Sequence, residues 1–136
     1  MPAGVIGGLL GTALAGLAEV LVFSGLERPS TPQARSLRII AAAFVGGQAA
    51  LGLVIALLAA SIADVEIPLA VAFASAGMLG LGAFGVALTY RLHATSAPFA
   101  DEVRARARTI VLMAVADAIG VLGAILAILT LFLSEA

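Results

Sequence analysis

Four long apolar stretches constrain this chain of 136 residues more than any other feature. They cover residues 3–25, 37–62, 67–90 and 109–133. A helix rises about 1.5 Å per residue, so about 20 residues cross the ~30 Å hydrocarbon core of a bilayer. No strand-like alternation is sustained, and backbone groups inside hydrocarbon must be paired within their own segment. We therefore predict an all-α membrane protein with four transmembrane helices.

Composition supports this class and excludes others. Only 11% of the residues are charged and 62% are hydrophobic, whereas a water-soluble domain is about 25% charged. Cysteine is absent, which excludes disulfides and cysteine metal sites, and the single histidine, His93, is predicted to lie in a polar connector. We expect no metal, no cofactor and no nucleic-acid partner. The N-terminal residues lack a basic region, so no cleavable signal peptide is expected.

The basic residues divide between two connectors, 26–38 and 91–108, whereas the short connector at 64–66 is acidic. Because cytoplasmic loops carry an excess of basic residues, both arginine-rich connectors are predicted to be cytoplasmic. Both termini would then lie on the opposite side. The basic residues are Arg28, Arg35, Arg38, Arg91, Arg104, Arg106 and Arg108.

The two halves of the chain match each other at an offset of 69 residues. We predict tandem transmembrane hairpins, at 1–63 and 64–136, of the same topology, unlike the inverted repeats of many transporters. In this register Gln48 is equivalent to Asp117, although beyond Ala49 an offset of 71 fits better. The other matches are Gly8 with Gly77, Gly11 with Gly80, Gly16 with Gly85, Pro29 with Pro98, and Arg35 with Arg104.

Glycines concentrate in the first and third apolar stretches. Small residues four apart let helix backbones approach closely in a membrane. They indicate either ordinary helix packing or a narrow inner ring of first and third helices, with the bulkier second and fourth helices outside. The predicted packing glycines are Gly8, Gly11, Gly16, Gly77, Gly80, Gly82 and Gly85.

Three side chains with a carboxyl or amide group fall inside the apolar stretches: Glu19, Gln48 and Asp117. A carboxylate near the bilayer centre costs about 2.5–3.5 kcal/mol, so Asp117 is predicted to be functional rather than a helix-packing acid. Glu19 is interpreted as a buried paired acid or as a second ion site. Gln48 is interpreted first as a structural hydrogen-bonding residue, and otherwise as a spent acid position or an ion ligand.

The surroundings of Asp117 resemble a known family. Residues 116–128, ADAIGVLGAILAI, resemble the carboxylate helix of rotary ATPase proteolipids, the c subunits of F-type and the c or K subunits of V-type enzymes. A glycine-rich helix before a proline-containing connector, with Pro29 or Pro98, also fits. One acid in the last of four helices resembles the duplicated V-type form, with Gln48 where the first hairpin has lost its acid. The chain departs from the pattern in having Asp rather than Glu, and Leu122 in place of an aromatic residue.

The resemblance implies a homo-oligomeric rotor ring in contact with lipid, a stator subunit that supplies an arginine, and a central stalk that touches the cytoplasmic connectors. Asp117 would be neutral while facing lipid and would lose its proton beside the stator arginine. The chain would have no catalytic residues, because catalysis belongs to partner subunits. No hydroxyl lies near Asp117 in sequence, which favours protons over sodium. The stalk-facing residues would be Arg28, Pro29, Arg35 and Pro98.

Two alternatives remain open. Residues 17–20, LAEV, resemble the first helix of small multidrug-resistance transporters, in which Glu19 would be the essential acid. Those transporters lack the duplicated hairpin and the acid in the fourth helix. The other alternative is a purely structural four-helix membrane subunit in which Asp117 is inert.

Overall fold

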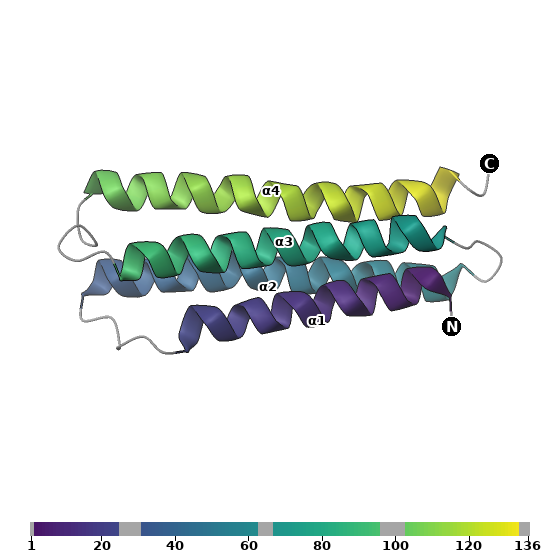
Figure 1. The fold of residues 1–136 in the computed structure, drawn as a ribbon, viewed down its shortest axis with the longest axis horizontal. Helices are drawn as coiled ribbons and strands as arrows, with labels where there is room; N and C mark the ends of the chain where they lie inside the picture. The colour runs from purple at the N-terminus through teal and green to yellow at the C-terminus, as the bar shows by residue number, and fades with distance from the viewer. Residues whose placement is uncertain (1, 25–30, 63–66, 96–102, 134–136) are drawn as a thin grey trace.

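The computed structural model describes residues 2–24, 31–62, 67–95 and 103–133, and they form four helices (Figure 1). Each is long and apolar enough to span a membrane, as predicted for an all-α membrane protein. Successive helices run in opposite directions, so the C-terminal ends of α1 and α3 and the N-terminal ends of α2 and α4 lie at one end of the bundle (Figure 1). The first residues of α1 and the last residues of α4 lie at the other end. The helices are α1 (Ala3–Phe23), α2 (Pro32–Ser61), α3 (Leu69–Ala94) and α4 (Val103–Leu133).

Three helix ends extend beyond the predicted apolar spans into the arginine-rich segments. Helix α2 begins at Pro32, where the Thr31 side chain accepts a hydrogen bond from Ala34 N at 3.1 Å, a normal N-terminal cap. Helix α4 begins at Val103, and α3 continues to Ala94. The predicted location of His93 in a connector is therefore wrong: it lies in the last turn of α3 and is only 9% exposed.

The helices pack as a four-cornered bundle. Helix α1 contacts α2 and α3 extensively, and α3 contacts α4 extensively. Helix α2 makes smaller contacts with α3 and α4, whereas α1 and α4 scarcely touch. The order around the bundle is thus α1, α2, α4, α3, with α2 and α3 close across the diagonal.

Glycines create the closest helix–helix approaches. A Cβ placed on Gly8 of α1 would lie 2.5 Å from both Ala56 N and Gly52 O of α2. A Cβ on Gly82 of α3 would lie 2.9 Å from Ala116 O of α4. These contacts involve backbone atoms, which cannot move aside cheaply, so the two approaches depend on glycine.

Helices α1 and α3 interlock through two further glycines. Leu79 of α3 fills the space beside Gly11, and Leu14 of α1 fills the space beside Gly80. In each case a Cβ on the glycine would lie 2.8 Å from the leucine Cδ1. The predicted packing role thus has a specific form here, in which each helix supplies a leucine to the other's glycine.

The remaining predicted packing glycines differ among themselves. A Cβ on Gly85 would lie 3.0 Å from Ala116 Cβ, so this glycine also belongs to the α3–α4 contact. A Cβ on Gly16 or on Gly77 would meet no neighbouring atom within 4 Å among the described residues. These two glycines therefore pack against no other helix within the described parts of one chain.

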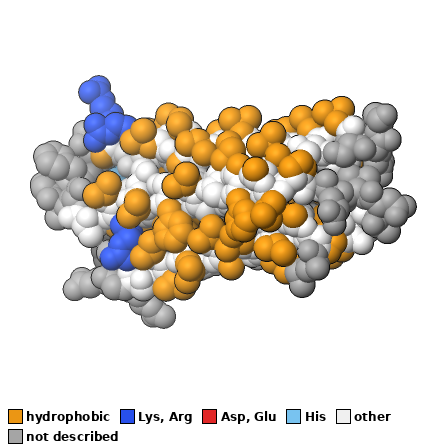
Figure 2. Space-filling model, turned by 45° about the vertical axis from the view of Figure 1, so that its right-hand side comes forward, with side chains coloured by type: hydrophobic (Ala, Val, Ile, Leu, Met, Phe, Trp, Pro, Cys, Tyr) orange, Lys and Arg blue, Asp and Glu red, His pale blue; other side chains and the backbone are white. Residues whose placement is uncertain are grey.

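Small residues make up much of the interior, together with a few large side chains such as Leu79, Met113 and Leu131. The core is rich in alanine, such as the fully buried Ala15, Ala18 and Ala83. Many large apolar side chains instead face outward, among them Leu81, which is 70% exposed. Figure 2 shows hydrophobic side chains along the visible face and basic ones near one end. This distribution suits a bundle surrounded by lipid.

Candidate functional site

The most polar point in the interior of the bundle joins Gln48 of α2 to Asp117 of α4. Gln48 Nε2 donates a hydrogen bond to Asp117 Oδ1 at 2.5 Å and another to the backbone oxygen of Asp117 at 2.9 Å. The two residues that the internal repeat makes equivalent are therefore in direct contact. The repeat predicted a common depth in the membrane but not this contact.

Gln48 is completely buried, whereas Asp117 is half-buried. Gly120, one turn after Asp117, leaves the space that the Gln48 amide occupies, and a Cβ there would overlap Gln48 Oε1. Gly82 of α3 packs against the same turn of α4. Glycines on two helices thus shape the site.

Gln48 Oε1 is buried and has no hydrogen-bond partner among the described residues. A buried acceptor without a donor is unfavourable by about 1–3 kcal/mol. A neutral carboxylic acid has one O–H donor, whereas a carboxylate has none. Of the two forms of the Asp117 side chain, only the neutral acid has an O–H that an acceptor such as Gln48 Oε1 can receive.

Two hydroxyl groups form hydrogen bonds between neighbouring helices, and sequence reasoning missed both. Thr12 Oγ1 of α1 donates to Ala49 O of α2 at 2.9 Å. Ser75 Oγ of α3 donates to Gly123 O of α4 at 2.9 Å. Their only signal in the sequence is a hydroxyl residue within a glycine-rich apolar stretch, because the recipients are backbone carbonyls of another helix.

Glu19 does not belong to this site. It lies on α1, which scarcely touches α4, the helix of Asp117. Its Oε2 atom is buried and has no hydrogen-bond partner among the described residues. Both interpretations of Glu19, a paired acid and a second ion site, therefore stay predictions, and Glu19 is a separate acidic position.

The predicted stalk-facing residues are only partly visible. Arg35 is exposed in the first turns of α2, while Arg28, Pro29 and Pro98 lie outside the described residues. At the same end, Arg91 Nη1 of α3 donates to the backbone oxygens of Leu21 and Ser24, at 2.9 and 2.6 Å. This arginine therefore binds the otherwise unpaired carbonyls at the C-terminal end of α1.

No known protein family matches this chain, and no curated protein matches it significantly. The features that bear on function are the contact between Gln48 and Asp117 and the sequence of residues 116–128.

Proposed function

We propose that this protein is a proton-carrying rotor subunit of a rotary ATPase or ATP synthase, a proteolipid of the duplicated c or K type. The observation that carries the proposal is Asp117, an acid in the middle of an apolar helix, bonded to the amide of Gln48. Ionisable residues inside membrane spans are costly and mark ion pathways more often than not. The resemblance of residues 116–128 to the carboxylate helix of rotary ATPase proteolipids is the reason for proposing this family.

The chemistry follows from the Gln48 amide. In a lipid-facing position the neutral acid is favoured, because charge is poorly solvated there. An O–H donated to Gln48 Oε1 would hold this neutral form. A stator arginine beside Asp117 would favour the carboxylate instead and release the proton to a water-filled channel. Asp117 would then be the carrier, and Gln48 would be a positioning residue.

A carried proton fits the site better than a carried sodium ion. Hard cations bind several oxygen atoms. The group that faces Asp117 Oδ1 is the Nε2 donor of Gln48, which cannot be a cation ligand in that orientation. The two nearby hydroxyls, of Thr12 and Ser75, both donate to backbone carbonyls.

Ring formation is supported by an asymmetry in the packing. If a two-fold axis related the two halves, the α2–α3 and α1–α4 contacts would be equivalent. Helices α2 and α3 do pack together, whereas α1 and α4 scarcely touch. The contacts thus argue against a two-fold relation between the halves and favour a head-to-tail one. A head-to-tail interface repeated between chains closes into a ring when its rotation permits.

Two measurements on the protein purified in mild detergent test the proposal. Native mass spectrometry and top-view particle images should give a closed ring of many copies. A hydrophobic carbodiimide, which reacts with neutral carboxyl groups, should label Asp117 in peptide maps, and sodium at fixed pH should not protect it. Asp117→Asn should abolish this label, and the matched variant Glu19→Gln should retain it.

A dimer that is labelled at Glu19 instead of Asp117 would overturn the rotor proposal. It would favour the alternative of a small multidrug-resistance-like transporter. The observation that keeps this alternative is Glu19 Oε2, which is buried without a hydrogen-bond partner among the described residues. Acids inside membrane spans commonly mark proton or substrate pathways. A ring in which neither acid is labelled would leave a structural membrane subunit.

A further inference from the structure

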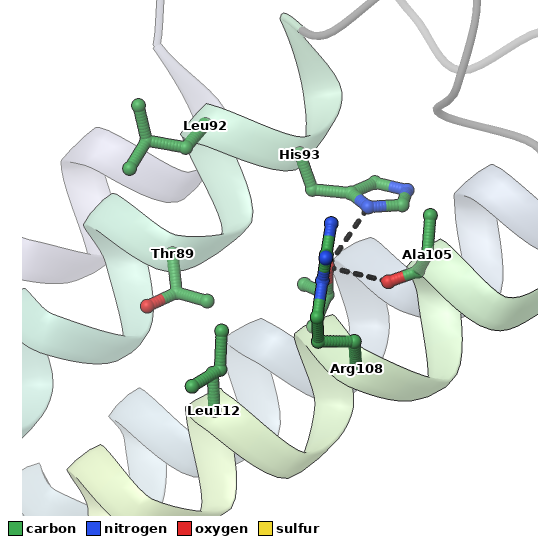
Figure 3. A pocket seen from close by; sticks show the side chains of 7 residues that line it. Thr89, Leu92, His93, Ala105, Arg108 and Leu112 are labelled. Carbon is green, nitrogen blue, oxygen red and sulfur yellow. Dashed lines mark hydrogen bonds between the residues drawn. The ribbon is translucent and has the colours of Figure 1, made fainter.

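A pocket of about 330 Å³ opens between α3 and α4 at the arginine-rich end of the bundle (Figure 3). Its volume is within the range of small-molecule sites. His93 from the last turn of α3 and Arg108 from the second turn of α4 line the end nearer the connectors. Thr89 and Leu112 line the end nearer the middle of the helices.

The polar part of the pocket is basic and firmly built. Thr109 Oγ1 lies 2.9 Å from His93 Nδ1 and also donates to Ala105 O at 2.9 Å, so the imidazole is held against α4. Arg108 extends from α4 on the same side as His93 (Figure 3). Arg108 is exposed, and none of the described residues provides it with a hydrogen bond or an ion pair.

The end of the pocket nearer the middle of the helices is apolar. Leu112 is 50% exposed and Leu92, beside the opening, is 68% exposed. The Thr89 hydroxyl donates to Gly85 O of its own helix at 2.7 Å, so this residue presents mainly its methyl group. A ligand here would meet a cation at one end and hydrocarbon at the other.

The depth of Arg108 matches a lipid phosphate. Arg108 lies nine residues before Asp117 in α4, which is about 13 Å along the helix axis. If Asp117 is near the bilayer centre, Arg108 lies close to the boundary of the ~30 Å hydrocarbon core, where phosphate groups begin. Basic pockets between transmembrane helices at this depth bind anionic head groups.

We propose that this pocket binds one anionic phospholipid, with its phosphate on Arg108 beside His93 and an acyl chain along Leu112. The proposal commits to a lipid rather than a free anion, because most of the pocket lining is apolar and includes the exposed Leu92 and Leu112. It requires that the four helices span a membrane with Asp117 near the bilayer centre, and it does not depend on a rotor function.

Native mass spectrometry of the delipidated protein in mild detergent tests the proposal. Phosphatidylglycerol and phosphatidylcholine with identical chains would be added separately, and the retained lipid would be counted. We expect retention of one phosphatidylglycerol in preference to phosphatidylcholine. Arg108→Gln should reduce this preference about fivefold, the effect of one basic residue at an anionic membrane surface. Arg108→Lys should keep most of it, because the charge is unchanged.

Arg35→Gln is the matched control, because it removes one exposed charge from the same end of the bundle without lining the pocket. Equal losses in Arg35→Gln and Arg108→Gln would overturn the proposal in favour of a diffuse basic surface. Displacement of the lipid by millimolar inorganic phosphate would indicate a free-anion site and would also overturn it. Equal retention of the two lipids by the unmodified protein would do the same.

Discussion

At the scale of single residues, the pairing of Gln48 with Asp117 has a measurable energy. Removing one side chain leaves the other without the hydrogen bond between Gln48 Nε2 and Asp117 Oδ1, whereas removing both is less costly. We expect Gln48→Leu and Asp117→Leu each to lower the free energy of unfolding. The double variant should lose less than the two single losses added together. The coupling energy should be about 0.5–2 kcal/mol, as for other polar pairs between membrane helices. Unfolding in mixed micelles, followed by helical circular dichroism, measures it, and a coupling of zero would contradict the contact.

Gly120 provides a second residue-scale prediction. A methyl group at this position overlaps Gln48 Oε1, so Gly120→Ala must displace the amide or spread α2 from α4. We expect a loss of about 1–3 kcal/mol, typical of overpacking in a full core. Gly46→Ala is the matched control, because no atom lies within 4 Å of its Cβ position. In a Gln48→Ala background the cost of Gly120→Ala should largely disappear, and an unchanged cost would show that the overlap is elsewhere.

At the scale of helices, hydropathy predicted the number and approximate location of the elements but not their ends. A hydropathy window reports where lipid contact stops, whereas a helix ends where its backbone hydrogen bonds end. Around Thr31 the capping hydroxyl starts α2 ahead of the apolar stretch. His93 stays helical despite its polar neighbours, because Thr109 of α4 binds its ring. Such contacts between helices cannot be read from one stretch of sequence.

The site was predictable to a similar extent. Asp117 could be predicted because an acid in an apolar span is energetically unfavourable and is seldom present without a function. The internal repeat then predicted that Gln48 lies at the equivalent depth. Their contact depends on how α2 and α4 lie side by side, which the repeat does not determine. The bonds from Thr12 and Ser75 end on backbone carbonyls, which carry no mark in the sequence.

Close helix contacts lead to a prediction at this scale. Gly8→Ala should destabilise the α1–α2 contact by about 1–3 kcal/mol, because the new Cβ meets backbone atoms of α2 at 2.5 Å. Gly16→Ala, on the same helix, meets nothing within 4 Å and should be neutral or stabilising by up to about 1 kcal/mol, since alanine is the better helix former. Denaturation in mixed micelles compares the two variants. Equal costs would mean that Gly16 is packed against another chain.

At the scale of the whole molecule, the orientation in the membrane is a prediction that the absence of cysteine makes simple to test. Ser36 and Ser61 are exposed near opposite ends of α2, and 25 residues of helix between them span about 37 Å, more than the hydrocarbon core. A membrane-impermeant maleimide applied to right-side-out vesicles should label Ser61→Cys and spare Ser36→Cys. Inside-out vesicles should show the opposite pattern, and the reversed result would place the arginine-rich end outside.

The amide at position 48 affects how many protons the proposed rotor would carry in each revolution. Where two equivalent hairpins could each hold an acid, this chain holds one acid and one amide, and the two are bonded together. A ring of such chains would carry half as many protons per revolution as a ring of equal helix number with an acid in every hairpin. At ~100 mV each proton supplies about 2.3 kcal/mol, so a full turn would deliver half the energy from the same membrane potential. Such a rotor is better suited to pumping protons against a steep gradient than to driving ATP synthesis from a shallow one.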